Sequence, residues 1–340
     1  MEVELVNEIR IDVFGDHLSI VSTVRRVRPK EFKKPQEFVC PFCAGNEELT
    51  PPATLVLVKE GGVEKWLRDS DGERVKGWSV RIVPNKFPAL TTSPPKPRAP
   101  SYVEAYGYHE VVIETPSHVG DVHELSNEQF VDALRATFRR VSEMMGDPRV
   151  ESVVVIKNRG PRAGASILHA HSQVFALPTV PKRVEREVRV FESGSNPLCS
   201  YLEKELRSGE RVVYRGTHFV AVAYEAPRIG FETWVIPVKH ELTPLSIDRD
   251  ALEELALVLR ALSYAVVKTA GFENFNWWIH MAPKSAKDFH WHIEVAPVSS
   301  TWGGLEKGGD AFIVEYSPEE AARILRKGVE EFLRTSPKRS

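Results

Sequence analysis

Two similarly spaced histidine patterns occur in this chain, one in each half. In the first half, the patterns of a helix and a strand separate His118 from His169-Ala170-His171. In the second half, the same kinds of segment separate His240 from His290-Trp291-His292. The interval from His118 to His171 is 53 residues, and that from His240 to His292 is 52. Such a regular period indicates a duplicated strand-helix-strand-strand unit.

The segments between these histidines carry recognisable helix and strand signals. Ser126-Asn127-Glu128-Gln129 forms a capping box, which predicts a helix from there to about Gly146. A second amphipathic helix is expected over roughly 248–270, with Gly271 ending it. Strands are predicted at 9–14, 17–21, 108–114, 150–157, 231–240 and 275–280, and a last helix is predicted to start at Ser317 and end near Arg334.

The stretch 164–178 begins with Gly, Ala and Ser and continues as a β-forming run. Because alternate side chains of a strand share a face, we expect His169, His171 and Gln173 on one side of a strand. One interpretation is a set of hydrogen-bonded polar residues on a wet sheet face. The other is a nucleophile, since a neutral imidazole can attack phosphorus and form a covalent intermediate. Loop amides and the Gln173 amide would then hold the phosphoryl oxygens.

A C-x-x-C segment lies at Cys40-Pro41-Phe42-Cys43. Its tight turn lets two thiolates reach one ion, and tetrahedral zinc then needs two further ligands from elsewhere. The alternative is two reduced cysteines in a loop. The chain has three cysteines, an odd number that argues against a disulfide framework and favours a metal role.

Charge and composition exclude several classes of partner. With 45 basic and 47 acidic residues, the chain lacks the positive excess expected of a protein that binds nucleic acid or an anionic membrane. The start, residues 1–5, has no basic or apolar leader character, and no apolar run approaches the roughly 20 residues that span a bilayer. We therefore expect a cytoplasmic protein. The low glutamine content is typical of thermophilic proteins.

Three motifs together resemble a known active-site segment: Asn158-Arg159-Gly160, Gly164-Ala165-Ser166 and His169-x-His171-x-Gln173. They are similar to the galactose-1-phosphate uridylyltransferases, a branch of the histidine-triad superfamily, and equally to the ADP-glucose phosphorylases of that branch. The resemblance implies an α+β fold of two tandem histidine-triad-like domains, with mainly antiparallel sheets and packed helices. Residues 1–190 would form the catalytic domain with the zinc site, and residues 191–340 the second domain.

The same resemblance implies roles for individual residues. His171 would be the nucleotidylated nucleophile, and zinc would be bound by Cys40, Cys43, His118 and His169. The implied substrate-binding residues are Arg25, Arg28, Asn85, Asn158, Gly164, Ser166, Gln173 and Glu306. Phe42 and Phe87 would enclose the base. Lys86 departs from uridylyltransferases that carry Asp there, and Asp310 departs from the usual Gly near the sugar.

The second half leaves a second metal site open. By pseudo-symmetry, Cys199, His240 and His290 would repeat part of the zinc set, although Asn196 replaces the other cysteine. Uridylyltransferases have an iron-like site near the positions of His280 and His292, and here Glu294 replaces a histidine. Alternatively, these histidines are hydrogen-bonded interior residues. Because a carboxylate repels phosphate, Glu294 indicates that only the first copy is catalytic.

The expected activity follows from this resemblance. It is a ping-pong exchange of UMP between UDP-glucose and galactose 1-phosphate, through a uridylyl-His171 intermediate, in a homodimer. An ADP-glucose phosphorylase, which accepts inorganic phosphate, is a rival supported by Lys86. Two further hypotheses are a zinc-stabilised protein that binds nucleotides without turnover and a triad hydrolase that releases the nucleoside monophosphate.

Overall fold

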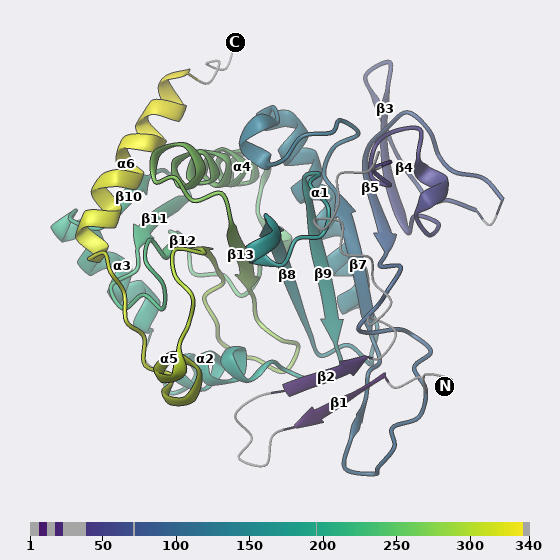
Figure 1. Cartoon of the computed structure of the whole chain (residues 1–340), viewed down its shortest axis with the longest axis horizontal. Coiled ribbons are helices and arrows are strands. Elements are labelled where there is room, and N and C mark those ends of the chain that lie inside the picture. The colour runs from purple at the N-terminus through teal and green to yellow at the C-terminus, as the bar shows by residue number, and fades with distance from the viewer. Residues whose placement is uncertain (1–6, 12–17, 23–38, 71, 195, 336–340) are drawn as a thin grey trace.

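The computed structural model of the 340-residue chain describes residues 7–11, 18–22, 39–70, 72–194 and 196–335. Within these ranges the strands form one large sheet and one small sheet, and helices cover the large sheet (Figure 1). Every strand pairing of both sheets is antiparallel. The predicted mixed fold with mainly antiparallel strands is therefore confirmed.

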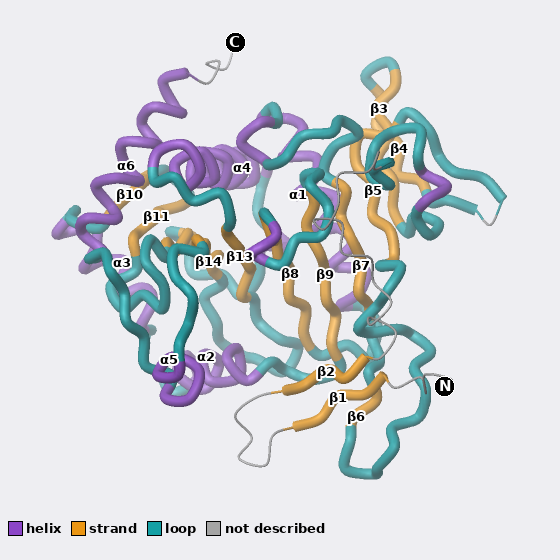
Figure 2. Tube along the Cα trace, in the orientation of Figure 1, coloured by secondary structure: helices purple, strands orange, loops and turns teal. Residues whose placement is uncertain are grey.

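The large sheet contains eleven strands and runs through both halves of the chain. In pairing order, its strands are β10 (Val212–Arg215), β11 (Phe219–Ala223), β12 (Thr233–Pro237), β14 (His292–Pro297), β13 (Phe275–His280), β8 (Ser152–Arg159), β9 (His171–Leu177), β7 (Tyr108–Ile113), β5 (Trp78–Pro84), β3 (Leu55–Glu60) and β4 (Val63–Leu67). The small sheet, seen beside one end of β9 in Figure 2, consists of β2 (Leu18–Ser22), β1 (Asn7–Ile11) and β6 (Val103–Glu104).

The two halves use the same strand order. β5, β7, β9 and β8 are neighbours in the first half, and β11, β12, β14 and β13 are neighbours in the second. The two sets meet where β8 pairs with β13. Counted outward from this junction, the corresponding strands of the two halves follow in the same spatial order. A division into two domains at residues 190 and 191 remains a prediction, and this boundary falls inside α2 (Lys182–Glu192).

Most of the helical residues lie in three long helices. The α-helices are α1 (Asn127–Met145), α2, α3 (Pro197–Ser208), α4 (Arg249–Tyr264), α5 (Gly304–Gly309) and α6 (Pro318–Thr335). The short helices are η3 (Glu47–Leu49), η4 (Val122–Glu124), η5 (Pro161–Ala163), η6 (Pro244–Ser246) and the π-helical turn η7 (Ala265–Thr269). Among the described residues, no helix is both long enough and apolar enough to cross a bilayer.

The predicted starts of α1 and α4 are confirmed. The Ser126 hydroxyl accepts the Gln129 N–H and caps α1, and Asp248 caps α4 through the Ala251 N–H. The segment predicted as one helix over 248–270 changes from α to π geometry at Ala265. There Gly328 of α6 lies so close that a Cβ on it would meet the Ala265 Cα at 2.8 Å.

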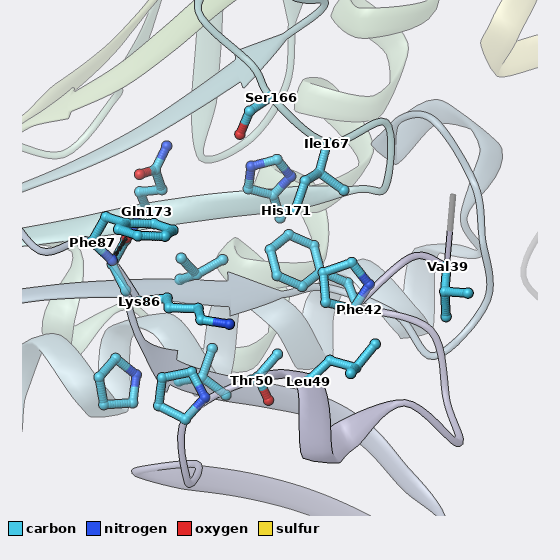
Figure 3. A pocket seen from close by; sticks show the side chains of 16 residues that line it. Val39, Phe42, Leu49, Thr50, Lys86, Phe87, Ser166, Ile167, His171 and Gln173 are labelled. Carbon is cyan, nitrogen blue, oxygen red and sulfur yellow. Dashed lines mark hydrogen bonds between the residues drawn. The ribbon is translucent and has the colours of Figure 1, made fainter. Parts of the chain in front are cut away.

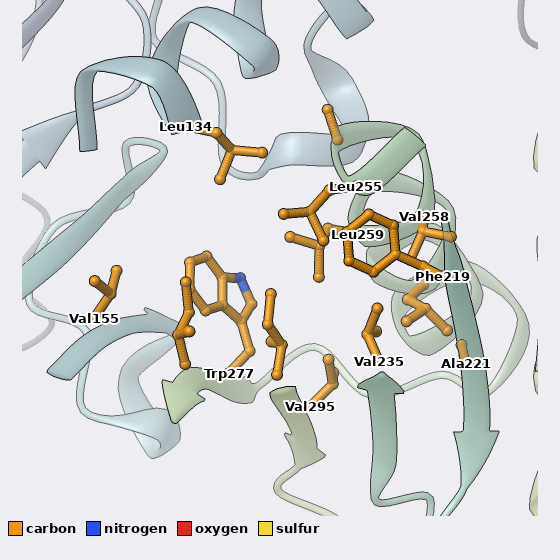
Figure 4. Close-up of a cluster of buried hydrophobic side chains, with 14 of the residues drawn as sticks. Leu134, Val155, Phe219, Ala221, Val235, Leu255, Val258, Leu259, Trp277 and Val295 are labelled. Carbon is orange, nitrogen blue, oxygen red and sulfur yellow. The ribbon is translucent and has the colours of Figure 1, made fainter. Parts of the chain in front are cut away.

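The main core lies between one face of the large sheet and helices α1, α4 and α6. Figure 4 shows side chains from β8, β12, β13 and β14 meeting side chains from α1 and α4; those labelled include Leu134, Val155, Val235, Leu255, Val258, Leu259, Trp277 and Val295. Because strand side chains alternate, the residues between these point to the other face. That face carries His171 and Gln173 in the first half and His292 and Glu294 in the second.

Candidate active site and metal centre

A cavity of ≈ 320 Å³ lies on this second face of the sheet, in the first half of the chain. His171 and Gln173 of β9 form one wall, and both side chains rise from the strand toward Ser166 (Figure 3). Phe42 and Phe87 lie on either side of the cavity. The volume and the mixed apolar and polar lining are those of a small-molecule site.

The strand that carries His171 starts later than the sequence pattern suggests. β9 begins at His171, whose Cα is paired with that of Ile113, so His169 precedes the strand. Here the Ala170 N–H donates to Val119 O, which holds residues 169 and 170 against a loop. The prediction that His169, His171 and Gln173 share one strand face is therefore wrong for His169, while His171 and Gln173 do share it.

A backbone contact fixes the tautomer of His171. Its Nδ1 lies 2.7 Å from His169 O. Because a carbonyl oxygen only accepts, Nδ1 carries the proton and the lone pair of the neutral ring is on Nε2. The carbonyl of His171 accepts from Lys157 Nζ at 3.1 Å, and this buried ammonium also pairs with Glu114 at 2.6 Å. These bonds fix the backbone beneath the imidazole.

The loop before β9 depends on two glycines in the left-handed region. Gly160 has φ 81° and Gly164 has φ 89°, conformations that other residues rarely adopt. Asn276 of β13 donates from Nδ2 to both Ala163 O (2.8 Å) and Asn158 Oδ1 (2.7 Å). Gly164 and Asn158, both predicted to bind substrate, lie outside the cavity lining, which includes Ser166 of the same loop.

Gln173 contacts a residue to which sequence reasoning gave no role. His109 of β7 is buried, and its Nε2 lies 2.9 Å from Gln173 Oε1. Its Nδ1 accepts the Ala89 N–H at 3.0 Å. Asn85, predicted to contact the nucleoside, lines the cavity and accepts the Phe87 N–H through Oδ1. A histidine beside Tyr108 at the start of a predicted strand was the only sequence signal for His109.

The four predicted zinc ligands are brought together beside the cavity. Cys40 Sγ lies 3.6 Å from His169 Nδ1, and Cys43 Sγ lies 3.3 Å from His118 Nδ1. All four ligand atoms are within 4.8 Å of one another. Tetrahedral zinc, with bonds of about 2.3 Å to sulfur and 2.0–2.1 Å to nitrogen, separates S and N by about 3.5 Å. The donor set and its spacing therefore fit this ion.

The protonation chemistry of this cluster also suits a metal. His169 Nε2 lies 2.9 Å from Thr115 O and donates to it, which leaves the Nδ1 lone pair facing the cysteines. Burial lowers the pKa of His169 to about 4, so this imidazole is neutral at pH 7. Burial raises the pKa of Cys40 to about 12 in the metal-free cluster, and a bound cation would favour its thiolate.

The second half contains a three-donor cluster at the corresponding place. Cys199 Sγ lies 3.6 Å from His240 Nδ1 and 3.5 Å from His290 Nδ1. Asn196 Nδ2 lies 2.6 Å from the same His240 Nδ1, where the first half has a cysteine. Asp288 Oδ1 holds the opposite ring nitrogen of His240 at 2.8 Å. An amide that donates a hydrogen bond thus takes the place of the second thiolate of the first cluster.

A second polar cluster surrounds Glu294. Its two oxygens are each 2.5 Å from an arginine nitrogen, one of Arg183 and one of Arg228. The His292 ring is 3.4 Å away. Burial alone would raise the pKa of Glu294, but the bond to His292 and the nearby positive charges lower it. Glu187, His280, His292 and Glu294 have the spacing of a metal site, yet arginines occupy both Glu294 oxygens.

Besides Asn158 and Gly164, three further predicted substrate residues lie away from the cavity or outside the described ranges. Arg25 and Arg28 lie outside the described residues. Glu306 belongs to α5, where its carboxylate accepts the Gly303 N–H (2.8 Å) and the Ile313 N–H (3.3 Å). It does not line the cavity of its own chain. The structure thus assembles His171, Gln173, Ser166 and Asn85 around one cavity.

Sequence comparisons identify relatives of almost the same length. The chain is 28% identical over 343 residues to the ADP-glucose phosphorylase of Arabidopsis thaliana, covering 94% of this chain and 92% of the relative. It is 28% identical over 341 residues to the galactose-1-phosphate uridylyltransferase of Thermotoga maritima, covering 94% and 98%. A family model described as the N-terminal domain of a domain of unknown function (DUF4931) matches residues 102–180.

Solved structures give the same result. A structure described as uridylyltransferase superposes with a TM-score of 0.80 at 26% identity, covering 96% of this chain and 99% of that chain. The ADP-glucose phosphorylase from Arabidopsis thaliana with bound ADP-glucose superposes with a TM-score of 0.71 at 27% identity, covering 95% and 99%. The comparisons thus confirm that this chain resembles the galactose-1-phosphate uridylyltransferases and the related ADP-glucose phosphorylases along nearly its entire length.

Proposed function

We propose that this chain is a nucleotidyltransferase that exchanges UMP between UDP-glucose and galactose 1-phosphate through a covalent uridylyl-His171 intermediate. One observation carries the proposal: Nδ1 of His171 lies 2.7 Å from the backbone carbonyl oxygen of His169 and donates its proton to it, which leaves the nucleophilic lone pair on Nε2. The imidazole lines a cavity with Ser166 and Gln173, two groups that can bind phosphoryl oxygens. Similarity to full-length nucleotidyltransferases supports this reaction class.

The reaction proceeds in two displacements. Nε2 of His171 attacks the α-phosphorus, a P–N bond forms, and the P–O bond to glucose 1-phosphate breaks. An oxygen of galactose 1-phosphate then attacks the same phosphorus, and the P–N bond breaks to return the neutral imidazole. Throughout, the His169 carbonyl continues to accept the Nδ1 proton and stabilises the positive charge of the substituted ring.

Zinc is proposed as a structural ion held by Cys40, Cys43, His118 and His169. Bound there, zinc would cross-link the loop that carries Phe42, through Cys40 and Cys43, to the turn before His171, through His169. The Phe42 ring already lies 5.3 Å from that of His171, so fixing this loop also fixes one side of the cavity.

The remaining substrate contacts extend this proposal beyond the cavity of one chain. Arg25 and Arg28 would bind the diphosphate, as guanidinium groups do. Glu306 would contact the sugar in the active site of a partner subunit, which fits its absence from the cavity of its own chain. We expect such a homodimer to act in the cytoplasm.

A second candidate is an ADP-glucose phosphorylase, in which AMP replaces UMP and inorganic phosphate replaces galactose 1-phosphate. Lys86 favours it, because this ammonium group lines the cavity where uridylyltransferases carry a carboxylate. The similarity to the Arabidopsis enzyme supports it equally well. The same His171 chemistry serves both candidates.

The test is the intact mass of zinc-loaded protein after mixing with UDP-glucose alone or with ADP-glucose alone, followed by peptide mapping. We expect a uridylyl adduct on His171, and none in a His171→Gly variant that remains folded. An adenylyl adduct instead would establish the phosphorylase. The absence of any adduct with either donor would overturn the covalent mechanism, and release of free nucleoside monophosphate without an acceptor would indicate a hydrolase.

A further inference from the structure

We propose that His109 is a positioning residue that turns the amide N–H groups of Gln173 toward the phosphoryl group being transferred. The proposal deepens the function proposed above and rests on it. Nothing in the strand pattern around His109 marks it as functional, and it does not line the cavity. Its effect is exerted through Gln173, which does.

His109 is held rigidly behind the cavity wall. It is only 2% exposed, and its ring stacks on Phe175 with centroids 4.1 Å apart and an interplanar angle of 22°. It lies on β7 next to β9, where Val111 is paired with Gln173. A buried imidazole in this position must satisfy both ring nitrogens through hydrogen bonds.

Hydrogen-bond geometry assigns the tautomer of His109. The backbone N–H of Ala89 is a donor by nature, and it points at Nδ1 from 3.0 Å, so Nδ1 has the lone pair. A neutral imidazole then carries its single proton on Nε2. The atom 2.9 Å from Nε2 is Gln173 Oε1, and this bond therefore runs from His109 to Gln173. Asn85 Nδ2 also lies 3.2 Å from Nε2, but accepting from it would require a proton on Nδ1, where the Ala89 N–H already points. The same clash excludes an imidazolium.

The direction of this bond decides what Gln173 presents to a ligand. Because Oε1 is occupied as the acceptor for His109, the amide nitrogen of Gln173 takes the other side of the group. Two N–H donors then serve the cavity, where negative charge on phosphoryl oxygens increases in the transition state. Were the amide rotated by 180°, its carbonyl oxygen would face those oxygens and repel them. His109 thus selects the useful one of two nearly isosteric orientations.

The second half shows what happens when this pair is charged. Trp234 is paired with Glu294 as Val111 is with Gln173, so Glu232 corresponds to His109. Arg228 Nη2 contacts both glutamates, at 2.8 Å from Glu232 and 2.5 Å from Glu294. In each half the two corresponding side chains are linked, His109 to Gln173 by a direct hydrogen bond and Glu232 to Glu294 through Arg228. Only the first half keeps this pair neutral and capable of donating hydrogen bonds.

Two substitutions separate the two hydrogen bonds of His109. In His109→Asn, the side-chain oxygen can replace Nδ1 and accept from Ala89, but nothing reaches Gln173. In His109→Gln, the amide nitrogen can replace Nε2 and donate to Gln173 Oε1. We expect His109→Asn to lower kcat by roughly tenfold or more and to weaken nucleotide binding as well, because Gln173 donates to the same phosphoryl group in the bound and in the reacting nucleotide. His109→Gln should stay within about threefold of the original enzyme.

A double-mutant cycle distinguishes positioning from a general structural effect. In a Gln173→Ala background, His109→Asn should produce no further loss of kcat, because the amide that it orients is gone. Equal losses in both His109 variants, or multiplicative losses in the double variant, would overturn the proposal. Thermal unfolding of each variant shows whether it is folded at the assay temperature.

Two readouts do not depend on turnover. Binding of UMP or AMP should weaken by roughly tenfold in His109→Asn, while binding of uridine or adenosine should not change. Nitrogen-15 NMR of labelled histidine should show His109 as the Nε2–H tautomer at pH 7. An Nδ1–H tautomer would overturn the proposal. Absence of a His171 adduct alongside these two expected results would overturn the reaction proposed above and leave the role of His109 in phosphate binding intact.

Discussion

The two halves of the sheet place a histidine at the same position, His171 on β9 and His292 on β14. Each ring directs Nδ1 at the carbonyl two residues before it, at 2.7 Å and 3.1 Å respectively. The neighbour two residues later is Gln173 in the first half and Glu294 in the second. The same backbone thus supports two histidines in different chemical surroundings.

The difference concerns how charge is handled. Around His171, the neutral pair His109 and Gln173 can donate hydrogen bonds without carrying charge. Around His292, Glu294 is buried and bound by two arginines, and its carboxylate together with Glu187 raises the pKa of His292 against the opposing effect of burial. Conserving a fold therefore does not conserve a phosphoryl site. Such a site needs hydrogen-bond donors directed at the phosphoryl group and a lone pair on the nucleophile, and in the second half the arginines bind Glu294 instead.

The largest expected effect separates the two histidines directly. His171→Asn should lower nucleotidyl transfer by on the order of 10⁴-fold or more, because the nucleophile is lost. The matched change His292→Asn should leave the adduct on His171 in whatever fraction of the protein is folded. Intact-mass analysis and steady-state rates of both variants measure this. A nucleotidyl adduct on His292, or equal rate losses, would break the comparison.

The ion network of the second half should matter for stability rather than for transfer. Arg228→Met leaves one oxygen of the buried Glu294 without its guanidinium partner and should lower the free energy of unfolding by about 3–5 kcal/mol. Urea unfolding measures it. As a control, Arg135→Met removes a half-exposed pair with Glu64 and should change stability by less than about 1 kcal/mol. Similar values for the two variants would contradict this assignment.

Sequence patterns predicted the parts of the site that are local. The alternation of His171 and Gln173, the glycine-rich loop and the C-x-x-C spacing each occupy one short stretch. Their physical requirements, a shared strand face, a left-handed turn and two converging thiols, are met within a few residues. The repeated spacing likewise anticipated the matching strand orders of the two halves.

What the sequence could not predict depends on pairing between distant segments. His109 meets Gln173 across 64 residues, and its tautomer depends on a backbone N–H 20 residues away. Arg183 and Arg228 come from an α-helix and a loop to reach Glu294. Strand register determines which distant side chains come into contact. It is set by the pairing of the whole sheet and cannot be read from a short stretch of sequence. The start of β9 also differs from the prediction: the Ala170 N–H donates to Val119 O in a loop, and the strand begins only at His171.

Metal content sharpens the comparison further. We expect one zinc per chain, held by the four-donor cluster, since Asn196 offers His240 a hydrogen-bond donor where zinc would need a thiolate. Cys43→Ala should abolish zinc binding, and Cys199→Ala should leave the stoichiometry unchanged. Elemental analysis by mass spectrometry measures both. Free zinc at 100 times its Kd should stabilise the original chain by about 2.7 kcal/mol. Two zinc ions per chain would refute the assignment.

The smallest expected effect is a pH dependence from the second half. Burial lowers the pKa of His290 from 6.5 to about 4, so between these values the unfolded chain binds more protons at this residue than the folded chain does. The stabilisation is therefore complete above pH 6.5 and is lost as the pH falls toward 4. His290→Gln keeps a donor for Pro237 O, the acceptor that His290 Nε2 uses at 2.9 Å, and removes the titration. From pH 6.5 to 4.5, the original chain should lose about 2 kcal/mol more unfolding free energy than this variant, measured by urea unfolding. Parallel pH profiles would instead mean that the pKa of His290 is the same in the folded and the unfolded chain, and they would refute this prediction.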